Sequence, residues 1–113
     1  MDIMSIKDVE KFIEWEISRL DKAHPTSSDV EKIFWAESKL NEETGELAEQ
    51  VLSYLGYQRP EKLAKFDKKD IAKEVADVIF VTVILAKRLG VDVEEALKEK
   101  MAIIEERIYN KDI

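Results

Sequence analysis

Apolar residues recur every three or four positions along most of the chain, a spacing typical of amphipathic helices. In residues 5–23 this spacing gives one continuous apolar stripe, formed by Ile6, Val9, Phe12, Ile13, Ile17 and Leu20. Ser5 stands where an N-cap is expected, and Asp8 follows three positions later, as in a capping box. The pattern therefore predicts a first helix that begins at about Ser5 and ends before a loop at residues 24–29.

A second, longer helix is predicted over residues 30–55. Ser28 or Asp29 can cap its start, and Gly56 suits the left-handed conformation in which many helices end. Gly45 lies in the interior of this helix, where glycine costs about 0.5–1 kcal/mol relative to alanine. We therefore expect another backbone or a ligand to approach the helix closely at this position.

Two more helices complete the predicted fold. Residues 57–69 form a basic connection with room for one helical turn. A third helix then runs over residues 70–89 and stops at Gly90, and a fourth runs from Asp92 to about Tyr109. The chain is therefore expected to be all-α, a helical bundle of four main helices.

The composition limits what such a bundle can do. The chain has 113 residues, 45% of them hydrophobic and 38% charged, which suits one globular domain over residues 1–113. Because the core of so small a bundle is thin, we expect it to self-associate through helix packing. A net charge of −7 argues against a nucleic-acid partner. The chain has no cysteine, no signal-peptide pattern and no apolar run long enough to span a bilayer, so we expect a cytoplasmic protein without a membrane partner.

An acidic residue inside an apolar run is the most informative chemical feature. Asp77 is the single charged residue of residues 75–86, a run that predicts a helix covered by protein on nearly every side. An ionised carboxylate there costs several kcal/mol unless a cation or strong donors meet it. Glu74, three residues earlier, projects from the same helix face.

A second acidic cluster lies on the preceding helix, at Glu42, Glu43, Glu46 and Glu49. Taken alone, such a helix face is usually solvated and paired with neighbours such as Lys39. Because solvation does not explain Asp77, the two clusters together favour a metal site. All-oxygen ligands favour Mg²⁺ or Mn²⁺, whereas a di-iron bundle would need Glu-x-x-His pairs, which neither cluster has.

The residues Lys-Leu-Asn-Glu-Glu-Thr-Gly-Glu-Leu-Ala-Glu at 39–49 and Glu-Val-Ala-Asp-Val at 74–78 together resemble a known signature. It is the E-x-x-E…E-x-x-D motif of MazG-type nucleotide pyrophosphohydrolases, in the all-α NTP pyrophosphatase superfamily. The resemblance covers roughly residues 30–108. It implies Mg²⁺-dependent cleavage of a nucleoside triphosphate between its α and β phosphates, giving the monophosphate and pyrophosphate, with Mn²⁺ as a substitute.

The resemblance also implies roles for single residues. Those expected to ligate the metal are Glu43, Glu46, Glu74 and Asp77. Glu42 and Glu43 are the expected catalytic acids, with Glu42 orienting the attacking water or helping to hold another ion. A homodimer or homotetramer is implied, with active sites near the subunit interfaces.

Four residues are expected to bind the substrate. Lys39, Lys100 and Arg107 would meet the outer phosphates, although Ile104 stands where the family often carries asparagine, and Trp35 would stack on the base. For these residues the alternatives are surface charge and simple packing. His24 is expected to be a surface residue and not a catalytic base.

Two other functions stay open at this point. The main expectation is a (d)NTP pyrophosphohydrolase with a role in nucleotide-pool house-cleaning, and the first alternative is a related enzyme that acts on dUTP, dCTP or phosphoribosyl-ATP. The second is a non-catalytic helical module whose acids bind structural cations or a basic partner.

Overall fold

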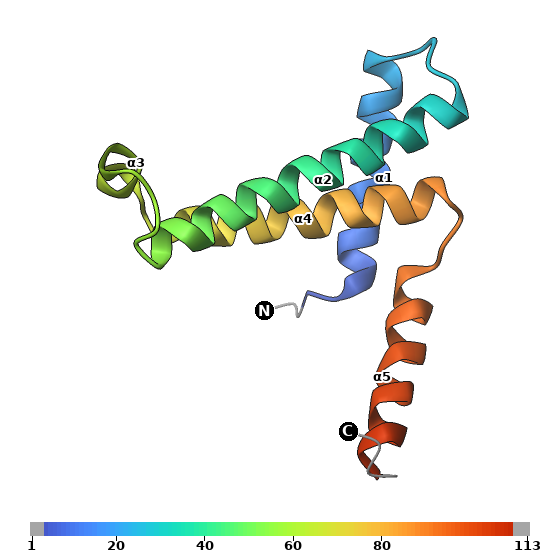
Figure 1. Cartoon of the computed structure of the whole chain (residues 1–113). Coiled ribbons are helices and arrows are strands. Elements are labelled where there is room, and N and C mark those ends of the chain that lie inside the picture. Colours follow the sequence, from blue (N-terminus) through green and yellow to red (C-terminus); the bar gives the residue numbers. More distant parts are fainter. Residues whose placement is uncertain (1–3, 110–113) are drawn as a thin grey trace.

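A computed structural model describes residues 4–109, and every regular element in that range is a helix (Figure 1). The elements are α1 (Ile6–Ala23), α2 (Asp29–Tyr54), α3 (Pro60–Lys65), α4 (Lys69–Arg88) and α5 (Val93–Tyr109). The prediction of an all-α fold with four main helices is confirmed. The additional short helix, α3, is the helical turn expected in the basic connection. Among the described residues, no helix combines the length and apolar character needed to cross a bilayer.

Local signals set the helix boundaries. Ser5 and Ser28 each form a reciprocal capping box with the acid three positions later, at the starts of α1 and α2. Gly56 and Gly90 follow the ends of α2 and α4 with φ of 82° and 72°, the left-handed region that other residues rarely adopt. The predicted boundaries therefore agree with the structure to within one or two residues.

Helices α2 and α4 run side by side in opposite directions, and α1 crosses them (Figure 1). The buried core lies at that crossing and consists of Ile13, Ala36, Val83 and Ile84, each at most 4% exposed. Full burial of a side chain such as isoleucine contributes about 1.5–3 kcal/mol. The crossing therefore holds the three helices together.

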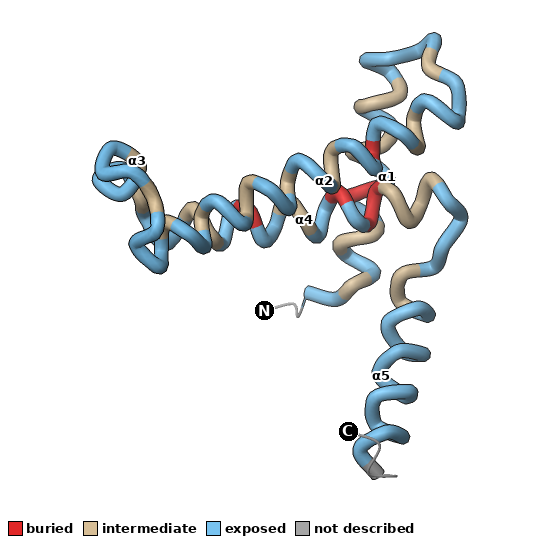
Figure 2. The backbone as a smooth tube through the Cα atoms, viewed as in Figure 1, coloured by how far each residue is buried: buried red, intermediate tan, exposed pale blue. Residues whose placement is uncertain are grey.

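Helix α5 leaves this core and runs away from the α2–α4 pair (Figures 1 and 2). Its first turn is tied to α1, because Lys7 lies 3.0 Å from Glu94 and the Glu94 amide donates to Glu10. From Glu95 to Ile108 every residue is exposed. The Cα radius of gyration is 17.6 Å, against about 13 Å expected for a compact chain of this length. A single chain thus leaves much helix surface uncovered.

The burial expected of residues 75–86 is not found in the single chain. Residues 75–86 are not covered on nearly every side, since Val75, Ile79 and Phe80 are 41%, 48% and 37% exposed. On α2, Val51 and Leu55 are also exposed, because the side of the helix that carries Glu43 is turned towards α4. A helical wheel identifies the two sides of a helix but not which of them meets the neighbour.

No other part of the described chain approaches Gly45 closely, so the expectation of a close backbone approach is wrong within the single chain. A Cβ added at this position would meet no atom within 4 Å outside the local helix backbone. Nothing in the structure explains why glycine stands there.

Candidate metal centre

Three carboxylates from two helices converge between α2 and α4. Glu43 and Glu46, one turn apart on α2, and Glu74 on α4 each place one carboxylate oxygen within 4.8 Å of the others. No other group of three or more potential metal ligands occurs among the residues that the structure describes. The convergence follows from the antiparallel packing of α2 and α4, which brings two i, i+3 acidic pairs to the same level.

Two of these carboxylates are buried beyond what their hydrogen bonds justify. Glu74 is only 8% exposed, and the Glu43 side chain is 12% exposed. On each, the Oε2 atom is buried without a hydrogen-bond partner. A buried oxygen without a donor loses its hydration and gains nothing in exchange. This arrangement is unfavourable unless something binds there.

The pKa values of both groups reflect this strain. Burial, followed by the charge of Glu46, raises the pKa of the Glu43 carboxyl to about 7. Burial and the charge of Glu46 likewise raise the pKa of Glu74 above its ordinary value. Near neutral pH the centre therefore resists carrying its full negative charge.

Asp77 lies beside these three residues and not among them. Its charge contributes to the raised pKa of both Glu43 and Glu74, but its oxygens fall outside the group within 4.8 Å. It is half-buried, whereas Glu74 is buried, so the prediction that Asp77 is the deeply placed acid is wrong. One turn of helix separates the two, and α2 covers the earlier one more fully.

The centre fits a hard divalent cation. Its donors are all carboxylate oxygens, which suit Mg²⁺ and Mn²⁺, and two of the oxygens are buried without partners. A cation held by Glu43, Glu46 and Glu74 would satisfy those oxygens and offset the mutual repulsion of the three charges.

The remaining acids of α2 are solvated. The Glu42 side chain is 53% exposed and its Oε1 lies 3.2 Å from the Lys39 ammonium, which also lies 4.0 Å from Glu43. Glu49 pairs with Lys62 of α3 at 3.8 Å. Glu42 and Glu49 are therefore solvated and ion-paired, as is usual on a charged helix face, whereas Glu43 is largely buried.

The four expected substrate-binding residues are divided between two helices, α2 and α5. Lys39 and Trp35 lie on α2, one and two turns before Glu43. Lys100 and Arg107 are exposed on α5, which runs away from the acidic centre (Figure 1). Within one chain, the structure does not bring these two cations to the carboxylates.

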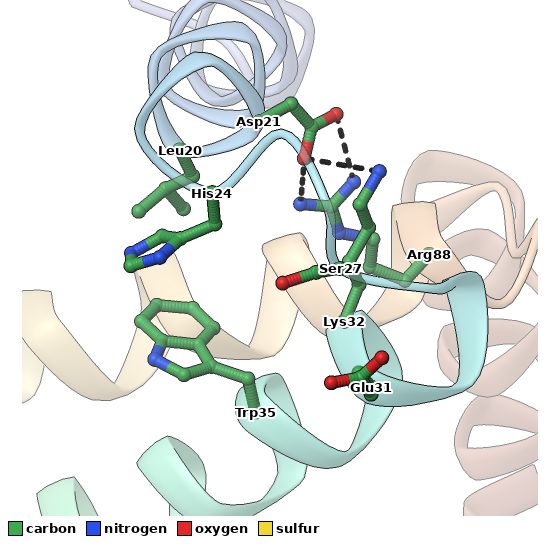
Figure 3. Close-up of a pocket in the computed structure, with 8 residues that line it drawn as sticks. All are labelled: Leu20, Asp21, His24, Ser27, Glu31, Lys32, Trp35 and Arg88. Carbon is green, nitrogen blue, oxygen red and sulfur yellow. Dashed lines mark hydrogen bonds and ion pairs between the residues drawn. The ribbon is translucent and has the colours of Figure 1, made fainter.

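A pocket of about 220 Å³ lies where α1, α2 and α4 meet (Figure 3). Trp35 forms part of its wall, as does His24, which is exposed as expected. The other lining residues are Leu20, Asp21, Ser27, Glu31, Lys32 and Arg88.

Residues 26–112, which are more than half of the chain and include both acidic pairs, match the model of the MazG-like family. The chain belongs to the MazG-like family. A similar curated protein is "Uncharacterized protein YpjD" of Bacillus subtilis (strain 168), which is 42% identical over 59 residues, or 52% of this chain. The match spans about half (51%) of that protein's length. No solved structure matches the chain.

The part of the chain that matches the MazG-like family contains the converging carboxylates of α2 and α4. The i, i+3 spacing identified the two acidic clusters, and the family resemblance selected Glu43, Glu46 and Glu74 from them together with Asp77. Sequence reasoning missed most of the pocket beside Trp35. The pocket residues come from three separate segments and share no spacing along the chain. The one available signal was an aromatic residue two turns before the acids, on the same helix.

Proposed function

We propose that this MazG-like chain is a Mg²⁺-dependent nucleoside triphosphate pyrophosphohydrolase that converts a (d)NTP to the (d)NMP and pyrophosphate. The observation that carries the proposal is the pair of buried, unpartnered carboxylate oxygens on Glu43 and Glu74. A triphosphate is strongly anionic and would be repelled by bare carboxylates, so a divalent cation is needed to bring the two together. Mn²⁺ would serve as a substitute because it prefers the same ligands.

Each acid then has a defined task. Glu43, Glu46 and Glu74, with Asp77 beside them, would hold the cation, which when bound would polarise a phosphoryl oxygen and lower the pKa of bound water. The pKa of Glu43 is raised to about 7 in the metal-free protein, and a bound cation would lower it and release the proton, leaving the carboxylate that ligates the metal. Glu42 lies next to it on the solvent side and would orient the attacking water.

Lys39 is the cation placed to meet the substrate. Its ammonium lies between Glu42 and Glu43, at 3.2 and 4.0 Å, on a side chain that is 34% exposed. Such exposed pairs are weak, contributing about 0.2–1 kcal/mol. An arriving phosphate can therefore draw Lys39 away from the carboxylates at little cost.

We further propose that the active unit is a homodimer or homotetramer. The chain exposes 8762 Å² of surface, against about 6,400 Å² expected for a compact monomer of its mass. Much of the exposed surface is apolar, including Phe34, Leu55 and Ile79. Packing against a second copy would cover these side chains. It would also let α5 of that copy bring Lys100 and Arg107 to the phosphates.

The direct test is pyrophosphate release from canonical and modified nucleoside triphosphates with Mg²⁺ and with Mn²⁺. The wild type should release pyrophosphate, and Glu74→Gln should not. Glu49→Gln is the matched control, since it makes the same chemical change at an exposed acid outside the centre. If no nucleotide in the panel yields pyrophosphate with either ion, the enzymatic proposal fails and a non-catalytic cation-binding module takes its place.

A further inference from the structure

The pocket beside Trp35 has one aromatic wall and one polar wall. His24, at the end of α1, and Trp35, on α2, lie next to each other along one side (Figure 3). The Ser27 hydroxyl and the Glu31 carboxylate stand on the other side, where the loop enters α2. Trp35 is 39% exposed, so its ring is open to a ligand. A planar molecule could pack against the aromatic wall and reach the polar wall with its edge.

The charges that line this pocket cancel. Asp21 forms hydrogen-bonded ion pairs with Arg88, at 2.8 and 3.3 Å, and its Oδ1 lies 3.5 Å from Lys32 (Figure 3). Glu31 supplies the second negative charge against the two cations. Because both cations already have a carboxylate nearby, the pocket does not favour a phosphate. It favours a neutral, flat group.

One lining residue retains an unused donor. The Nε–H of Arg88 is buried and has no hydrogen-bond partner, although the terminal nitrogens of the same guanidinium bind Asp21. Leaving such a group unpaired is unfavourable. Because this nitrogen is buried, a ligand in the pocket does not contact it, and the Arg88 guanidinium serves to hold Asp21 in place.

The pocket and the acidic centre lie along the same helix. Trp35, Lys39 and Glu43 follow one another at four-residue spacing on one side of α2. The eight residues from Trp35 to Glu43 correspond to about 12 Å along the helix axis. A nucleotide is long enough to span this interval, with Lys39 lying between its two ends.

We propose that this pocket binds the base of the nucleotide whose phosphates reach the carboxylate centre, and that it favours bases bearing an exocyclic amino group. The proposal rests on the proposed function for the position of the phosphates, while the pocket itself stands on its own geometry. Cytosine and adenine offer an amino donor to the Glu31 carboxylate on the polar wall. In uracil and thymine, the N3–H is flanked by two carbonyl oxygens, which the Glu31 carboxylate would repel.

Tryptophan fluorescence tests base binding without any hydrolysis. The chain has two tryptophans, so Trp15→Phe leaves Trp35 as the sole emitter; Trp15 is 59% exposed, which makes this change mild. Cytidine 5′-monophosphate with Mg²⁺ should quench Trp35 saturably, and uridine 5′-monophosphate should bind about tenfold more weakly. Adding His24→Ala should weaken the quench. If neither nucleotide quenches Trp35 at millimolar concentration, the pocket does not take the base.

Steady-state kinetics provide a second test of base binding. Trp35→Ala should raise KM for cytidine triphosphate about tenfold or more with kcat little changed, and Trp35→Phe should restore most of the loss. Glu31→Gln preserves the capping box at Ser28, because glutamine serves at that position as well as glutamate. It should reverse the preference towards uridine triphosphate, since an amide can donate to a carbonyl.

The two proposals fail in different ways. Quenching without pyrophosphate release from any triphosphate would leave the base pocket standing and overturn the enzymatic proposal. Pyrophosphate release with wild-type KM in both Trp35→Ala and His24→Ala would overturn the pocket and leave the enzyme standing. Release with an unchanged base preference in Glu31→Gln would overturn the role of Glu31.

Discussion

Two residues of α4, one in each half of the helix, are buried to the same extent and with opposite consequences. Glu74 and Val81, seven residues and two turns apart on one face, are each 8% exposed. Burial stabilises the fold at Val81, where neighbouring Val83 and Ile84 complete an apolar core. At Glu74 burial raises the pKa and leaves an oxygen without a partner. Core packing explains the burial of Val81, whereas the buried oxygen of Glu74 needs a partner that the apolar core does not need, either a bound cation or the proton held by Glu43.

The largest effect is expected at the apolar half. Ile84→Ala should lower the free energy of unfolding by about 2–5 kcal/mol, because it leaves a cavity among tightly packed side chains. Urea denaturation followed by circular dichroism measures this change. A loss below about 1 kcal/mol would mean that the crossing of α1 and α4 is not the main support of the fold.

At the acidic centre, unlike at Ile84, a substitution should stabilise the metal-free protein. Glu74→Gln removes a buried charge from the repelling cluster, so the metal-free protein should become more stable by about 1 kcal/mol, or roughly 4 °C in Tm. Pyrophosphate release should fall more than about 100-fold, since several kcal/mol of transition-state stabilisation depend on the cation. Activity near the wild-type level, or a destabilised Glu74→Gln, would contradict this account of the acidic half.

The stability contributed by the acidic centre should depend on pH, whereas that of the apolar core should not. Because the folded-state pKa of Glu43 is raised from 4.5 to about 7, the folded state holds a proton that the unfolded state has already released. The contribution of Glu43 to the free energy of unfolding is therefore fully present below pH 4.5 and is lost as pH rises through about 7. Glu74 shifts in the same direction.

Metal-free melts at several pH values, compared between wild type and a Glu43→Gln, Glu74→Gln double variant, measure this effect. The gain in Tm of the double variant over wild type should grow between pH 4.5 and pH 8. A constant difference across that range would show that these carboxyls titrate normally in the folded protein.

The smallest effect is expected at the exposed neighbour of the centre. Glu42→Gln breaks a weak surface pair with Lys39, so stability should change by less than about 1 kcal/mol. Pyrophosphate release should fall about tenfold, less than in Glu74→Gln, because Glu42 acts on the water and is not among the three converging acids. A loss as large as that of Glu74→Gln would place Glu42 among the metal ligands.

Much of the fold and part of the centre could be predicted from sequence because the signals are local. Ser5, Ser28, Gly56 and Gly90 mark helix ends through their own backbone and side-chain chemistry. The i, i+3 acidic pairs identify which carboxylates share a helix face, Glu43 with Glu46 and Glu74 with Asp77, and the family resemblance predicts that the two pairs meet.

The rest depends on how the helices pack, which a helical wheel does not contain. The wheel assigned Asp77 and Glu74 to one arc, but only the position of α2 decides that Glu74 is the more buried. The amphipathic pattern of α5 would be the same whether the helix covered its own chain or another copy. The pocket at His24 and Trp35 arises from three segments that meet only in the folded structure.

Thermal melting during a Mg²⁺ titration at pH 8 tests the central claim most directly, with wild type and Glu74→Gln side by side. If the three carboxylates hold a divalent cation, wild-type Tm should rise with Mg²⁺, reaching about 2.7 kcal/mol of stabilisation at a hundredfold excess over Kd, and Glu74→Gln should stay flat. A wild-type Tm that does not move at millimolar Mg²⁺, or an equal rise in both proteins, would contradict a metal centre between α2 and α4.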